Sequence, residues 1–210
     1  MNNKTFEQDI LRAVQVFPTL KIVGKPGQKY LKGILDIKNS KNVIVWSYSI
    51  EIKNGCMYPY RFPVAYEVGG DIPKGIDYHK YNDNSLCIDV ETSEILKCRR
   101  GLCVTDFIKR ELIPHLANQL HKKETGEYIS EYRHAEDGIR QYYQEYFGNK
   151  DDSYCIISYN NFLRNKPNRN EQCYCGSGKK YKHCHLNIDS KMQLIGISQI
   201  SKDFKLMHLI

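Results

Sequence analysis

The sequence predicts an α+β protein with an opening helix, an antiparallel meander of three or four strands, C-terminal helices and a small separate module. Three observations lead to this prediction. Apolar residues recur at helical spacing in residues 5–15, β-branched and aromatic runs fill residues 30–68, and helical spacing returns after residue 105. The change of period along the chain separates the expected sheet from the expected helices.

Composition favours a folded, non-membrane protein. The 210 residues allow one domain with an appendage or two small domains. Hydrophobic residues make up 41%, with 16 tyrosines and 7 phenylalanines, which is more apolar bulk than disordered chains carry. No apolar run reaches the roughly 20 residues that span a bilayer, and the N-terminus is too charged for a signal peptide. Of the eight cysteines, three have a metal-binding spacing and the rest are dispersed, so we expect the reducing cytoplasm.

Positive charge is concentrated at the C-terminal end. The net charge is +7, and residues 151–210 hold nine Lys and Arg against five Asp and Glu. An acidic partner or nucleic acid is one interpretation, but a solvated surface is the simpler one.

The opening helix and the strands are expected in order. In residues 5–15, helical spacing predicts that Phe6, Ile10, Leu11 and Val14 face the core. The strand-like runs are YLKGILDI (30–37), NVIVWSYSIEI (42–52) and FPVAYEV (62–68).

Residues 68–105 lose periodicity and are rich in Gly, Pro, Asn and Asp. Structureless stretches longer than about 12–15 residues are uncommon in compact domains unless they are functional. We therefore predict a functional loop here, and it contains Cys87.

Two helices are expected after this loop. One has Thr105 as its N-cap, ends near His121 and is kinked by Pro114. The other covers about residues 131–147, buries Ile139, Tyr143 and Phe147, and ends at Gly148.

The expected domain organisation has four parts. Residues 1–150 form the main domain, 151–172 a linker, 173–190 a metal-binding module and 191–210 a tail of ambiguous period.

The module contains the segment CYCGSGKKYKHCH, whose candidate metal ligands are Cys173, Cys175, Cys184 and His185. Gly176 and Gly178 permit the positive φ angles that the turn between the ligand pairs requires. Three thiolates and one imidazole make a closed tetrahedral site that prefers zinc, so we predict a structural Zn²⁺ ion.

This segment resembles the SEC-C motif, the zinc-binding module of the SecA translocation ATPase. Register with the motif selects His185 over the neighbouring His183. The resemblance implies a role in protein interaction, for which Lys179, Lys180 and Lys182 offer either a basic face or merely a solvated one.

The first 140 residues resemble the ubiquitin-conjugating (UBC) fold, in which a helix and a four-stranded meander precede a thioester cysteine. The shared landmarks are Tyr58-Pro59, Phe62-Pro63, His79 and Leu86-Cys87. The bacterial branch of that superfamily adds matches at Gly69, Gly70, Ile72, Pro73, Asp77, Asp83, Ser85, Thr125-Gly126-Glu127, His134 and Gly138.

This resemblance implies that Cys87 accepts an activated protein C-terminus as a thioester and passes it to a nucleophile. His79 and Asp83 would lower the pKa of the thiol or only hold the loop. The oxyanion-stabilising Asn of eukaryotic relatives has no counterpart in His79-Lys80-Tyr81, and either Asn82 or Asn84 is the expected substitute.

Other cysteines and histidines have competing interpretations. Cys98 and Cys103 are the rival nucleophiles, because Cys103 precedes an expected helix N-terminus, which stabilises a thiolate. Cys56 and Cys155 are expected to be buried. His134 is expected to satisfy a core hydrogen bond.

The leading functional expectation is a ubiquitin-conjugating-like transferase. Its partners would be a ubiquitin-like or otherwise activated protein and a separate activating enzyme, because the chain has no Gly-rich phosphate loop. The resemblance also implies antiphage (CBASS-type) defence, with a nucleotide cyclase as a possible target. The alternatives are a catalytically inactive UBC-like adaptor and a SecA-like or nucleic-acid contact through the basic tail.

Overall fold

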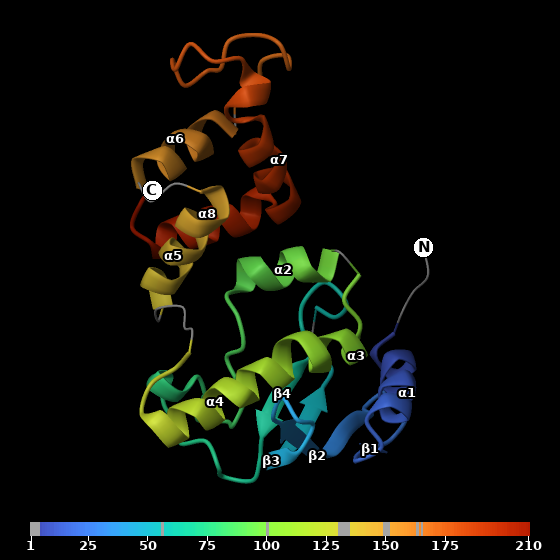
Figure 1. The fold of residues 1–210 in the computed structure, drawn as a ribbon. Helices are drawn as coiled ribbons and strands as arrows, with labels where there is room; N and C mark the ends of the chain where they lie inside the picture. The colour runs from blue at the N-terminus through green and yellow to red at the C-terminus, as the bar shows by residue number, and fades with distance from the viewer. Residues whose placement is uncertain are drawn as a thin grey trace. The chain divides into compact units, whose positions relative to one another are not determined.

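The computed structural model describes residues 5–55, 57–99, 101–129, 135–148, 152–162, 164 and 166–210. The chain divides into two compact units, Met1–Glu131 and Tyr132–Ile210 (Figure 1). The division therefore falls earlier than the expected boundary at residue 150.

The first unit is built on a four-stranded antiparallel sheet. The helix α1 (Phe6–Val16) precedes the strands β1 (Leu20–Val23), β2 (Tyr30–Lys38), β3 (Ile44–Lys53) and β4 (Val64–Glu67). The strands lie side by side in sequence order, so the sheet is a meander (Figure 1). The α+β prediction is confirmed at this level. Strand β1 was not among the predicted runs, because its four residues are too few to display alternation.

Helix α1 begins with a capping box. The Thr5 side chain accepts a hydrogen bond from the Gln8 backbone N–H, and the Gln8 side chain accepts one from the Thr5 N–H. Phe6 and Ile10 are buried as predicted, whereas Leu11 is exposed. Ala13, three residues after Ile10, fills the buried stripe instead.

Four helical segments follow Cys87: α2 (Glu91–Arg99), α3 (Val104–Phe107), a π-helical turn (Ile108–Leu112) and α4 (Ile113–Thr125). The prediction of a loop over residues 68–105 was wrong for residues 91–99, which form α2. That helix buries Thr92 and Ser93 beside Leu96, so its inner face gives no hydrophobic signal.

The helix expected from Thr105 also differs in detail. Its N-cap is Cys103, and Pro114 lies in the first turn of α4, directly after the π-helical turn. Proline lacks an N–H and clashes with the preceding turn of an α-helix, and the wider π turn accommodates it. The expected distortion is therefore present as a change of helix type.

The core of the first unit lies between the sheet and helices α1, α3 and α4. Alternate residues of β3, Tyr48, Ile50 and Ile52, face this core. Phe107 and Leu116 are fully buried on the helical side.

The second unit is helical. It contains α5 (Ala135–Phe147), α6 (Asp152–Phe162), a short 3₁₀ turn (Tyr181–His183), α7 (Leu186–Ile195) and α8 (Ile197–Leu206). Tyr143 and Phe147 of α5 are buried as predicted, and the Tyr143 hydroxyl donates to Asp203 of α8 over 2.8 Å.

Two expectations for the second unit need correction. Helix α6 occupies residues 152–162, where a linker was expected, because its buried Cys155 and Ser158 give the segment a packed face. The tail of ambiguous period is part of two helices, and its buried residues include Met192, Ile200 and Phe204. Among the described residues, no helix is long and apolar enough to cross a membrane.

Candidate functional site

The first candidate site is a cluster of three cysteines and one histidine in the second unit. Cys173 and Cys175 flank Tyr174, and Cys184 and His185 follow the 3₁₀ turn. Between the two pairs, Gly176 and Gly178 have φ angles of 75° and 71°, as the predicted turn requires. The turn thus brings Cys184 and His185 close to Cys173 and Cys175.

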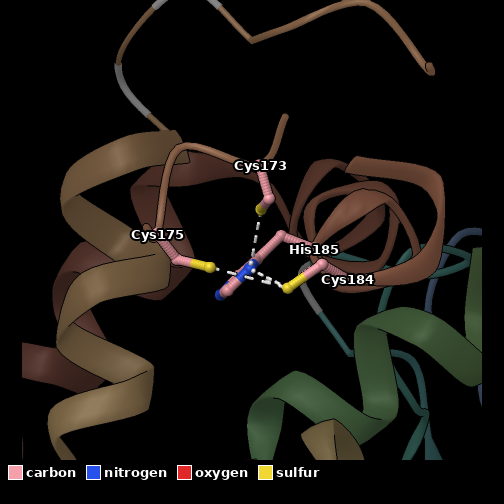
Figure 2. A group of neighbouring side chains, drawn as sticks. All are labelled: Cys173, Cys175, Cys184 and His185. Carbon is pink, nitrogen blue, oxygen red and sulfur yellow. Dashed lines mark hydrogen bonds between the residues drawn. The ribbon is translucent and has the colours of Figure 1, made fainter. Parts of the chain in front are cut away.

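The four side chains converge on one point (Figure 2). Their candidate ligand atoms all lie within 4.8 Å of one another. His185 Nδ1 is 3.2 Å from both Cys173 Sγ and Cys184 Sγ, and Cys175 Sγ is 3.5 Å from Cys184 Sγ. Zinc–sulfur bonds of about 2.3 Å place the sulfurs of a tetrahedral site about 3.8 Å apart, so this cluster could hold a metal ion.

Three tyrosines and one aspartate support the cluster from outside. The Tyr174 and Tyr181 hydroxyls donate to the two carboxylate oxygens of Asp189, over 2.9 and 2.7 Å. The Tyr154 ring stacks on His185 at a centroid distance of 4.8 Å. Burial raises the pKa of the Tyr154 hydroxyl to about 12.

The supporting roles of these residues were not predicted from the sequence. One signal was available, because Asp189 lies four residues after His185, which is one turn of a helix. The contact with Tyr154 depends on how α6 packs, and no spacing in the sequence encodes it.

The second candidate site is the loop that carries Cys87, which folds as a small hairpin. The Cys87 N–H donates to the His79 carbonyl over 2.8 Å, and the Tyr81 N–H donates to the Ser85 carbonyl over 2.9 Å. Lys80 and Leu86 therefore lie opposite each other. The second arm also pairs with β4, so the hairpin extends the sheet edge.

The hairpin has a buried face and an outer face. Lys80 and Leu86 point into the protein and are 3% and 7% exposed. Since side chains alternate along paired strands, His79, Tyr81 and Cys87 share the other face. The Tyr81 hydroxyl lies near enough to the Cys87 sulfur to influence its ionisation.

The ionisation of Cys87 is opposed by its surroundings. Burial raises the pKa of the thiol, and the carboxylates of Glu94 and Asp89 add to this effect. The nearby Tyr81 hydroxyl acts in the opposite direction and lowers the pKa of the thiol. Burial also raises the pKa of the Glu94 carboxyl to about 7. The expected lowering of the Cys87 pKa is therefore absent from this geometry.

The other residues predicted for this site lie close together, and the structure gives them turn-forming contacts. Asp83 accepts hydrogen bonds from the Ser85 N–H and hydroxyl, at 2.9 and 2.6 Å. Those bonds lower the pKa of the Asp83 carboxyl. Asn84 has a φ of 69°, and the Asn82 carbonyl accepts from Lys74.

The ring of His79 packs against His115 and Tyr128, at centroid distances of 6.2 and 5.6 Å. Burial lowers the pKa of His115 to about 3. His115 belongs to α4, so sequence spacing gave no indication that it would meet His79.

The rival cysteines occupy less accessible or differently bonded positions. Cys103 donates to the Asp106 carboxylate over 3.2 Å as the N-cap residue of α3. Cys98 is buried, and its burial raises the pKa to about 12. Cys155 is 1% exposed, which confirms the prediction of burial. Cys56 and His134 lie outside the described residues.

Comparison with known proteins finds a match at the Cys/His cluster. Residues 169–187 match the SEC-C motif, a zinc-binding motif. A segment of 25 residues is 72% identical to the protein translocase subunit SecA of Ectopseudomonas mendocina (strain ymp). The match covers 12% of this chain and 3% of SecA, so it concerns the motif alone. No solved structure matches the chain.

Proposed function

We propose that the first unit is a ubiquitin-conjugating-like domain that carries an activated protein C-terminus as a thioester on Cys87. The order of elements supports this proposal, because α1 and a sequential four-stranded meander precede the cysteine loop. Helices α2 to α4 follow the loop, as the resemblance implies.

The observation that carries the proposal is the placement of Cys87 on the outer face of a fixed hairpin. The backbone of Cys87 is tied to His79, while Lys80 and Leu86 anchor the opposite face in the protein. A nucleophile held in this way needs little reorganisation when a reacting carbonyl approaches. The neighbouring Tyr81 hydroxyl adds a polar group beside the sulfur.

The raised pKa of the Cys87 thiol has two opposite consequences for such chemistry. Fewer thiolates are present at neutral pH, which slows the loading step. However, a thiol of higher pKa gives a more nucleophilic thiolate and a poorer leaving group, so the thioester survives longer. This balance suits a carrier that holds its cargo until a target arrives.

For the second unit, we propose that Cys173, Cys175, Cys184 and His185 bind one structural zinc ion. The SEC-C match and the convergence of the ligand atoms support this assignment. A closed set of four protein ligands leaves no position for substrate or water. The module would then serve to dock a partner protein rather than to catalyse.

The proposed activity is testable by incubating the protein with ATP, an activating enzyme and candidate ubiquitin-like proteins. Products are compared on reducing and non-reducing gels. The proposal predicts an adduct that thiols remove from wild type and from Cys103→Ser. A thiol-labile adduct that persists in Cys87→Ser would reject Cys87 as the carrier.

The second candidate function is an inactive UBC-like adaptor, and the upward shift of the Cys87 pKa by burial favours it. An adaptor would bind the same partner with equal affinity in wild type and Cys87→Ala, with no covalent adduct in either. Antiphage defence and a nucleotide-cyclase target are predictions of the resemblance alone.

A further inference from the structure

We infer that Tyr81 is a catalytic residue of this site, and that its hydroxyl donates a hydrogen bond to the reacting atoms at Cys87. The inference rests on the proposed acyl-carrier function and goes beyond it, because the sequence pointed to Asn82 or Asn84 for this task. It follows from the register of the hairpin.

Tyr81 and Cys87 are diagonal neighbours on one face of the hairpin. The pairs 79 with 87 and 81 with 85 are fixed by backbone hydrogen bonds of 2.8 and 2.9 Å. Diagonal side chains on paired strands start about 7–8 Å apart, a distance that an aromatic side chain bridges. This register places the Tyr81 hydroxyl within reach of the Cys87 sulfur, and the hydroxyl influences the ionisation of the thiol.

The burial of the neighbouring Lys80 side chain determines the direction of the Tyr81 side chain. The Lys80 ammonium group donates to the Glu67 carboxylate and to the Ile72 carbonyl in the protein interior. Because Lys80 points inward, Tyr81 must point outward. Tyr81 is 56% exposed, so its side chain is accessible from solvent.

The two asparagines occupy the tip of the hairpin. The Asn84 N–H donates to the Tyr81 carbonyl, the Asn84 carbonyl accepts from Glu67, and the backbone of Asn84 is left-handed. The Asn82 carbonyl accepts a hydrogen bond from the Lys74 ammonium group. Asparagine tolerates positive φ better than other non-glycine residues, which explains Asn84 without a chemical role.

The chemistry is aminolysis of a thioester. The nitrogen of an amine attacks the carbonyl carbon on Cys87 Sγ, and negative charge develops on the carbonyl oxygen. The Tyr81 O–H donates to this oxygen and then to the departing thiolate. As the C–N bond forms and the C–S bond breaks, the amine loses one proton to water and Cys87 regains one from water. An amide and a free thiol result.

A small-molecule probe tests this step without the natural partners. p-Nitrophenyl acetate acetylates the zinc-loaded full-length protein, and free lysine then discharges the acetyl group from Cys87. Mass spectrometry of the Cys87 peptide measures the rate. Tyr81→Phe should discharge roughly tenfold more slowly, less than the 100-fold typical of enclosed donors because Tyr81 is half exposed.

Two further measurements separate this role from a structural one. In Tyr81→Phe, the pH profile of iodoacetamide alkylation at Cys87 should move to higher pH, because the nearby Tyr81 hydroxyl lowers the thiol pKa. The matched control is Tyr60→Phe at a surface tyrosine, which should discharge at the wild-type rate. Asn82→Ala and Asn84→Gly, which keeps the left-handed turn, test the rival assignment of the role to an asparagine.

The outcomes distinguish the two proposals. Equal discharge rates and equal pH profiles in wild type and Tyr81→Phe would overturn the role of Tyr81 and leave the carrier function standing. If Asn82→Ala or Asn84→Gly discharges the acetyl group slowly while Tyr81→Phe discharges it at the wild-type rate, the asparagine has the catalytic role and Tyr81 does not. A native protein whose Cys87 is never acetylated would overturn the carrier function itself.

Discussion

The ammonium group of Lys80 is buried against the carboxylate of Glu67, with side chains 2% and 0% exposed. The other Glu67 oxygen accepts the Gly69 N–H over 2.7 Å, and Lys80 also donates to the Ile72 carbonyl over 3.0 Å. The ion pair therefore fastens the turn after β4 to the hairpin that carries Cys87.

Removing one partner of this ion pair should strongly destabilise the first unit. Lys80→Met or Glu67→Gln leaves a buried charged group without its partner, which costs about 3–5 kcal/mol. Trp46, the one tryptophan of the chain, lies in β3 and reports urea unfolding of this unit by fluorescence. The midpoint should fall sharply in each single variant.

The double variant Lys80→Met/Glu67→Leu is the control. Replacing both charges with apolar groups of similar size removes the unpaired charge, so much of the lost stability should return. Additive losses in the double variant would show that the two groups act independently.

The burial of His115 predicts a pH-dependent stability. Its pKa falls from 6.5 to about 3 in the folded state, so the unfolded chain binds the proton first as the pH decreases. This contribution is complete above pH 6.5 and is lost progressively as the pH falls toward 3. Between pH 7.5 and 5.5 the loss should be on the order of 1 kcal/mol.

Urea titrations followed by Trp46 at these two pH values measure the effect. His115→Gln should reduce the difference between them, while His121→Gln, on the same helix, should retain it. An unchanged difference in His115→Gln would assign the pH dependence to other groups.

The metal cluster predicts one zinc ion per chain. Elemental analysis of Cys175→Ser should show a reduced zinc content, whereas Cys87→Ser should keep the full amount. Chelation should also expose the backbone amides of residues 173–195 to hydrogen exchange, because the ligands hold this segment together. Full zinc occupancy in Cys175→Ser would contradict the ligand assignment.

Asp189 should support metal binding without touching the metal. Asp189→Ala removes the acceptor of the Tyr174 and Tyr181 hydroxyls, and loss of such outer contacts weakens metal affinity by about 10–100-fold. Competition with a chromogenic chelator measures the affinity. Asp137→Ala, at an exposed residue in the first turn of α5, should bind zinc as tightly as wild type.

Patterns that repeat along the chain were the predictable part of this structure. The period-3.6 stripe of Phe6 and Ile10 and the alternation in β3 reflect burial against a single core, which the sequence records directly. The Cys/His cluster was equally readable, because a site for a four-coordinate metal restricts both residue type and spacing.

Features that depend on tertiary packing were not predictable in this way. Helix α2 buries Thr92 and Ser93, and a polar inner face resembles a loop in sequence. The burial of Lys80 reverses the usual exposure of lysine, and only its partner Glu67, 13 residues away, explains it. Tyr81 was not predicted, because its residue type differs from the asparagine of the related motif. The hairpin nevertheless places Tyr81 on the same face as Cys87.

The most direct test of the central claim is to isolate the protein from its native cells at acidic pH without reductant and to map Cys87 by mass spectrometry. We predict a polypeptide joined through its C-terminal carboxyl group to the Cys87 sulfur and released by hydroxylamine. The account would be contradicted if Cys87 of the isolated protein is a free thiol and any adduct on the protein persists in Cys87→Ser.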